Sequence, residues 1–167
     1  MSGFEGIQRI FFIRHAQSEY RDHIERISEK GKVDLKPTID FIRPKIDLGH
    51  ILGVCTSTAR KAIDTGLYVG DSFADITELG VMNLTTCPAL QFPEDAKQLY
   101  TELEQTLGKS SRNQWLIVGH EEVVDMFPAN FMSERFGTRG VPIDFGSRGY
   151  GKGVYINLRS GTWERIP

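Results

Sequence analysis

The stretch Arg9–Ser18, RIFFIRHAQS, decides the fold of this chain. It begins with the apolar run Ile10–Ile13 and turns abruptly polar at Arg14 and His15. A short apolar run bounded by polar residues is typical of a buried strand. In a parallel sheet, such a strand delivers its last residues to the carboxyl edge, where ligands bind in open α/β folds. We therefore expect a first strand that ends in an Arg-His pair at a candidate site.

Length and composition restrict the class of protein. The 167 residues suit one domain, 1–167, and 40% hydrophobic with 25% charged residues is an ordinary globular composition. The formal charge of -2 argues against a general nucleic-acid binder, which would carry a basic excess. No apolar run approaches the roughly 20 residues that span a bilayer, so no membrane association is expected.

The cysteines and the amino-terminal residues indicate a reducing compartment. Cys55 and Cys87 lack metal-ligand spacing, and free cysteines are commonly buried core residues. Residues 1–8 contain neither a basic region nor an apolar region of the signal-peptide type. We therefore expect a cytoplasmic protein with two core thiols and no disulfide.

Apolar patterns along the rest of the chain predict alternating strands and helices. Strands are expected at 9–13, at 51–55 and at 115–118. A further strand is expected at 81–84, within an extended segment 74–90, and a closing hairpin is expected at 153–158 and 162–165. Helices are expected at 34–46, at 59–69 after the hydroxyl N-cap candidates 56–58, at 93–107, and from Glu121, with Pro128 limiting or kinking the last. Residues 19–33 are expected to be irregular or a short exposed helix, and the glycine-rich stretch 137–153 a long loop. The alternation predicts an α/β fold: three layers, with helices on both faces of a mostly parallel sheet.

Three of the predicted strands end next to chemically active residues. The first ends in Arg14-His15, the second is followed by Arg60 in the first turn of a helix, and the strand 115–118 leads to His120. Parallel strands point the same way, so these groups are expected to converge at one edge of the sheet. Arginine offers planar donors that fit phosphate oxygens, and phosphoryl transfer requires mainly alignment and charge stabilisation. Two arginines and two histidines therefore predict a metal-independent phosphoryl site.

The same segments resemble a known family. RHAQS resembles the RHG motif of the histidine phosphatase superfamily, which includes the cofactor-dependent phosphoglycerate mutases. TSTARKAIDT resembles the segment around the family's second arginine, where Ser-x-x-x-Arg-Ala-x-x-Thr is usual, and VGHEEVV resembles the segment around its second histidine. The matches occur in family order, and the chain length is similar to that of the small SixA-type members.

The resemblance implies a role for each residue. His15 would attack phosphorus and carry a phosphohistidine intermediate, which water would then cleave, with no metal and no cofactor. Arg14, Arg60 and His120 would hold the phosphoryl oxygens. Gln17 and Ser18 would donate to the phosphate, or alternatively only cap local backbone. The substrate would be a phosphorylated small molecule or a phosphoprotein side chain, phosphohistidine among them.

Two departures from the family pattern concern the nucleophile and the general acid. Ala16 stands where the family has glycine, which we regard as tolerable because alanine is small. Ala89 occupies the place of the usual acid in a Pro-Glu-Leu-like context, and Glu121, directly after His120, is the first candidate for the acid that protonates the leaving group. Glu78, Glu94 and Asp95 are its alternatives. A phosphoglycerate-type mutase and a non-catalytic phosphate-binding module remain rival functions, the latter because of the missing acid.

Overall fold

The computed structural model describes residues 3–76, 84–137 and 149–167. Within this part, a sheet of six strands has the order β5-β4-β6-β1-β7-β8. Strands β1 (Arg9–Arg14), β4 (Leu52–Thr56), β5 (Thr85–Thr86) and β6 (Gln114–Gly119) are parallel, whereas β7 (Gly153–Asn157) and β8 (Thr162–Ile166) form an antiparallel hairpin at the edge. The mostly parallel sheet is confirmed, and so is the closing hairpin.

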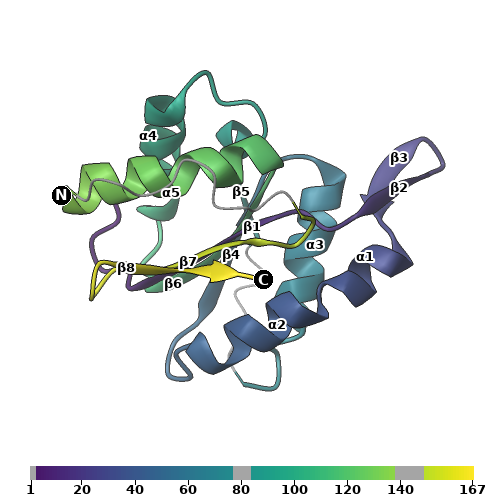
Figure 1. Ribbon diagram of the computed structural model, residues 1–167, viewed down its shortest axis with the longest axis horizontal. Helices are drawn as coiled ribbons and strands as arrows, with labels where there is room; N and C mark the ends of the chain where they lie inside the picture. Colours follow the sequence, from purple (N-terminus) through teal and green to yellow (C-terminus); the bar gives the residue numbers. More distant parts are fainter. Residues whose placement is uncertain (1–2, 77–83, 138–148) are drawn as a thin grey trace.

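Helices cover both faces of this sheet (Figure 1). One face is covered by α4 (Ala96–Leu107) and α5 (Glu121–Phe136), and the other by α2 (Lys36–Ile42) and α3 (Arg60–Asp71). A short helix α1 (Glu29–Asp34) precedes α2, and 3-10 turns lie at Arg43–Lys45 and Pro88–Leu90. The predicted three-layer α/β architecture is therefore confirmed.

The side chains of β1 explain why both faces need a helical layer. Ile10 and Phe12 lie in the core beneath α4 and α5, and Phe11 and Ile13 lie in the core beneath α2 and α3. Successive residues of a strand point to opposite faces, so a continuous apolar run requires apolar partners on both. The central strands are consequently buried on both sides, and Ile10–Ile13 are completely enclosed.

The register of the central strands brings two sequence motifs together. Arg14 lies opposite Gly119 in the β1–β6 pair, and Thr56 lies opposite Val118 in the β4–β6 pair. The backbone N–H of His15 donates to the carbonyl oxygen of Gly119 at 2.9 Å, just beyond the strand ends. The meeting of the Arg14-His15 and Gly119-His120 segments at the carboxyl edge therefore follows from parallel pairing in register.

Residues 19–33 depart from the expectation of an irregular segment. They contain most of a hairpin, β2 (Ser18–Arg21) paired with β3 (Ile24–Ile27), followed by the short helix α1. Asp22 and His23 form the turn with positive φ values of 50° and 67°, which is the backbone that a two-residue hairpin turn requires. The hairpin was missed because its strands are charged and exposed, without the apolar alternation that indicates a half-buried strand.

Smaller corrections concern helix ends and the extended segment. The residue that caps α3 is Ala59 rather than a hydroxyl residue, and it makes no side-chain cap bond. Pro128 does not limit the last helix, since α5 continues to Phe136. Of the expected strand around 81–84, residues 81–83 lie outside the described part, and the described strand nearby is Thr85–Thr86. Cys55 and Cys87 are buried free thiols, as expected.

Candidate active site

Two histidines meet at the carboxyl edge of the sheet. His15 follows β1 and is buried, and His120 follows β6 as the residue that caps α5. Their ring centroids are 5.0 Å apart with an interplanar angle of 62°, so one ring presents its edge to the other. The structure therefore brings together the two imidazoles that the sequence placed at separate strand ends.

The surroundings of His15 favour a neutral ring with one defined tautomer. Its Nδ1 lies 2.8 Å from the carbonyl oxygen of Ala16, which can only accept, so Nδ1 carries the proton and donates. Burial lowers the pKa of His15 from 6.5 to about 4, helped by the charges of Lys61 and Arg14 and opposed by the bond to Ala16. Near neutral pH, Nε2 of His15 thus holds a free lone pair, which a nucleophile needs.

His120 is also held neutral and in a fixed orientation. Its Nε2 lies 3.0 Å from the hydroxyl oxygen of Ser57, in the turn after β4. Burial lowers the pKa of His120 to about 4, and the charges of Lys61 and Arg14 act in the same direction, against that of Glu25. Ser57 was expected only as a helix cap. It links the β4 and β6 edges of the site instead.

Arg14 lies at the same edge, between a carboxylate and an aromatic ring. Its Nη1 is 3.4 Å from Oε2 of Glu121, and its guanidinium carbon is 4.1 Å from the ring centroid of Tyr150. The ring of Tyr150 also lies 5.7 Å from that of His15. The acid candidate Glu121 is therefore adjacent to the phosphate-site arginine, and Tyr150, which no sequence motif indicated, forms part of the site.

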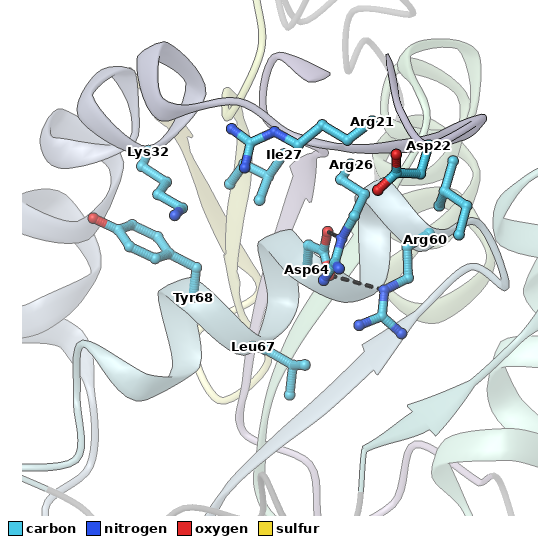
Figure 2. Close-up of a pocket in the computed structure, with 10 residues that line it drawn as sticks. Arg21, Asp22, Arg26, Ile27, Lys32, Arg60, Asp64, Leu67 and Tyr68 are labelled. Atoms are coloured by element: carbon cyan, nitrogen blue, oxygen red, sulfur yellow. Dashed lines mark hydrogen bonds and ion pairs between the residues drawn. The ribbon is translucent and has the colours of Figure 1, made fainter. Parts of the chain in front are cut away.

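The structure does not bring Arg60 to the two histidines. Its Nε is 3.1 Å from Oδ1 of Asp64, and its side chain is 49% exposed. Arg26 of the hairpin binds the same carboxylate through Nε and Nη2, at 3.0 and 3.1 Å (Figure 2). Burial would raise the pKa of Asp64, but the bonds and charges of Arg26 and Arg60 outweigh it and lower the pKa. Arg60 is thus paired within α3, and it is Arg26 that anchors the hairpin to this helix.

Arg60 lines a cavity of about 490 Å³ between the hairpin, α1 and α3, distinct from the histidine pair (Figure 2). The cavity is also lined by Arg21, Arg26 and Lys32. Each of these cations is paired with a carboxylate, namely Arg21 with Glu19, Lys32 with Glu29, and Arg26 with Asp64. The lining residues include no histidine, so this cavity lacks the pair of imidazoles that the carboxyl edge of the sheet carries.

Lys61, the next residue on α3, is a second cation near the histidine pair. Its charge lowers the pKa of both histidines, and its side chain is 20% exposed. One helical turn later, Oγ1 of Thr65 accepts a bond of 3.0 Å from the backbone N–H of Ala16, which ties this face of α3 to the end of β1. The charge of Lys61 therefore acts on both histidines, whereas Arg60 is paired with Asp64.

The family pattern itself can be aligned with Lys61 in place of Arg60. Counted from Ser57, the family pattern Ser-x-x-x-Arg-Ala-x-x-Thr aligns with Lys61, Ala62 and Thr65. Counted from Thr56, it aligns with Arg60 but with neither the alanine nor the threonine. The alignment from Ser57 agrees with more of the pattern and with the geometry.

The other candidate residues, Gln17, Ser18 and the alternative acids, take part mainly in local hydrogen bonds where the structure describes them. Oγ of Ser18 donates to Oε1 of Glu25 at 2.6 Å, and the carbonyl oxygen of Gln17 accepts from the backbone N–H and hydroxyl of Ser28. Asp95 caps α4 by accepting from the N–H of Gln98, and Glu94 is exposed before it. Glu78 lies outside the described residues. Asp95 is thus used structurally, and Ser18 reaches the site through Glu25.

Two features are absent from the described residues. They contain no group of three or more histidine, cysteine or acidic side chains that could hold a metal ion. Over the same residues, no helix combines the length and apolar character needed to cross a bilayer.

No protein-family model and no curated protein sequence matches the chain. Among solved structures, the protein histidine phosphatase SixA in complex with tungstate matches with a TM-score of 0.59 and 15% identity, over 94% of this chain and 93% of its own.

Two further structures agree. An Agrobacterium tumefaciens protein assigned as phosphohistidine phosphatase SixA gives a TM-score of 0.57 and 16% identity, over 96% of both chains. A mycobacterial glucosyl-3-phosphoglycerate phosphatase gives 0.52 and 12%, over 95% of this chain and 96% of its own. The chain therefore has the fold of the histidine phosphatase superfamily, and the SixA-like expectation is confirmed at the level of the fold.

Proposed function

We propose that this protein is a phosphatase that hydrolyses a phosphorylated substrate through a covalent intermediate on His15. The observation that carries the proposal is the state of the His15 ring. Its Nδ1 donates to the Ala16 carbonyl, and its pKa is lowered to about 4, mainly by burial. This leaves Nε2 as an unprotonated nucleophile at neutral pH, beside a second imidazole and two cations.

The reaction would proceed in two displacements at phosphorus. Nε2 of His15 forms a bond to phosphorus while the bond to the leaving oxygen or nitrogen breaks. Arg14, Lys61 and His120 surround the phosphoryl oxygens and stabilise their charge. Water then attacks the phosphohistidine, inorganic phosphate leaves, and His15 regains its starting state. Lys61 takes the place that the sequence gave to Arg60.

Glu121 is the proposed proton donor to the leaving group. It follows His120 directly and lies 3.4 Å from Arg14. If Glu121 is the acid, Glu121→Gln should slow hydrolysis of alkyl phosphates much more than that of aryl phosphates, whose phenolate leaves without a proton. If the substitution slows hydrolysis of alkyl and aryl phosphates equally, another residue is the acid.

The substrate class is a phosphomonoester or a phosphorylated protein side chain, with phosphohistidine included. Two of the similar structures are a protein assigned as phosphohistidine phosphatase and a glucosyl-3-phosphoglycerate phosphatase, and both support the general class. We also propose a cytoplasmic location, supported by the two free buried thiols.

The first test is hydrolysis of an aryl phosphate by the wild type and by His15→Asn. In the second, each protein is mixed with a ³²P-labelled phosphodonor and the reaction is quenched rapidly. We expect turnover only in the wild type, and a labelled protein whose phosphate is released by acid but not by base, as a phosphoramidate requires. Transfer of the label to an isomer of the donor would indicate a mutase. Phosphate binding without turnover or labelling would indicate a non-catalytic module.

A further inference from the structure

Lys61 is held in the site by a carboxylate from the hairpin. Its Nζ lies 3.0 Å from both oxygens of Glu25, and the hydroxyl of Ser18 donates to Oε1 of the same group at 2.6 Å. The side chains of Lys61 and Glu25 are only 20% and 31% exposed. This fixed, two-oxygen contact differs from the surface ion pairs of long, mobile side chains that contribute little.

Glu25 carries its charge next to the reacting groups. The hydrogen bond from Ser18 lowers the pKa of Glu25, and the bonds and charge of Lys61 add to this against a smaller effect of burial. The charge of Glu25 in turn raises the pKa of His120. The carboxylate is therefore an anion at neutral pH, and its charge acts on the histidine pair.

The two cations described at this edge each lie beside a carboxyl group. Arg14 is paired with Glu121, and Lys61 with Glu25. A phosphoryl dianion that enters beside His15 must share Lys61 with Glu25, and it meets the negative charge of that carboxylate at the same time. Like charges at such range are repulsive by an amount that solvent only partly screens.

We infer that Glu25 is a specificity-determining residue that weakens the hold of the site on a free phosphate dianion by competing for Lys61. The inference rests on the proposed function, in which inorganic phosphate is the product. Weak binding of phosphate favours its release after each turnover. Differences in affinity between substrates then depend mainly on the group to which the phosphoryl group is attached.

The experiment compares inorganic phosphate binding to the full chain by calorimetry in the wild type, Glu25→Gln and Glu25→Asp. Glutamine removes the charge but keeps an oxygen that accepts from Lys61, so phosphate should bind about three- to tenfold more tightly. Aspartate keeps the charge, so its affinity for phosphate should stay within about twofold of the wild type. Glu19→Gln on the same hairpin, where Glu19 pairs with Arg21, is the matched control and should change nothing.

Kinetics supply the second measurement. Glu25→Gln should be inhibited more strongly by product phosphate and should show a lower KM for aryl phosphate, whereas Glu25→Asp should not. Unchanged or weaker phosphate binding in Glu25→Gln, or equal effects of Gln and Asp, would overturn the inference. Tighter phosphate binding in Glu25→Gln without any His15-dependent turnover in the wild type would leave the inference standing and refute the proposed phosphatase.

Discussion

The imidazole rings of His15 and His120 meet edge to face, with centroids 5.0 Å apart, at the ends of two neighbouring parallel strands. The Arg14–Gly119 register of β1 and β6 sets this contact, and the carbonyl oxygens and hydroxyls around it fix both rings. Because burial lowers the pKa of each ring to about 4, the pair is uncharged under ordinary conditions. Four predictions follow from this site and its packing.

The first prediction concerns the protonation of the two rings. In ¹⁵N-detected imidazole spectra, His15 and His120 should titrate near pH 4, and His15 should carry its single proton on Nδ1. The variants His15→Asn and His120→Asn assign the signals. Titration of His15 near its ordinary value of 6.5, or a proton on Nε2 at pH 7, would remove the physical basis for its role as nucleophile.

The second prediction is a loss of stability on acidification. The unfolded chain takes up a proton on each histidine below about pH 6.5, whereas the folded chain does so only near 4. Protons therefore favour the unfolded state between these values, and stability falls as pH decreases from 6.5 towards 4. At pH 5 the loss for buried His15 amounts to about 2 kcal/mol, with less for half-buried His120.

Urea unfolding at pH 7 and pH 5 measures this loss. His15→Asn should reduce the difference between the two pH values by about 2 kcal/mol, since asparagine does not titrate. His23→Asn, in the exposed hairpin turn, is the control. Identical pH dependence in the wild type and His15→Asn would contradict the lowered pKa.

The third prediction separates two adjacent cations on α3. Lys61→Met should lower kcat/KM for aryl phosphate by about 10- to 100-fold, because it removes a charged contact to the phosphoryl group worth about 1.5–3 kcal/mol. Arg60→Met should change kcat/KM by less than about threefold. It should also cost under about 1 kcal/mol of stability, since the pair is half-exposed and Asp64 keeps Arg26. A larger kinetic loss in Arg60→Met than in Lys61→Met would restore the role expected from the sequence.

The fourth prediction tests the packing beneath the site. A Cβ added at Gly53 on β4 would lie 2.6 Å from Cε3 of Trp115, which is fully buried. Gly53→Ala should therefore destabilise the protein by about 1–3 kcal/mol in chemical denaturation. Gly49→Ala, whose added Cβ has its nearest neighbour at 3.7 Å, should stay within about 0.5 kcal/mol. Equal stabilities of the two variants would show that the core adapts around Trp115.

The strand ends could be predicted because they depend on local pattern. The apolar run before Arg14 and the one before His120 each indicate a buried strand, and the rule that ligands bind at the carboxyl edge of parallel strands places their last residues together. The amino-acid order thus determined the layers, the sheet and the meeting of His15 with His120. It also indicated the helices that follow, although their caps differed by one or two residues.

Only the tertiary structure decided which of the neighbours Arg60 and Lys61 lies near the histidines. Consecutive helical residues point about 100° apart, so the orientation of α3 against β1 decides that Lys61 faces the histidines and Arg60 faces the hairpin. Glu25 and Tyr150 reach the site only because a hairpin and the chain before β7 fold back over it. No local sequence pattern predicts these contacts, because they depend on packing between segments that are far apart in the sequence.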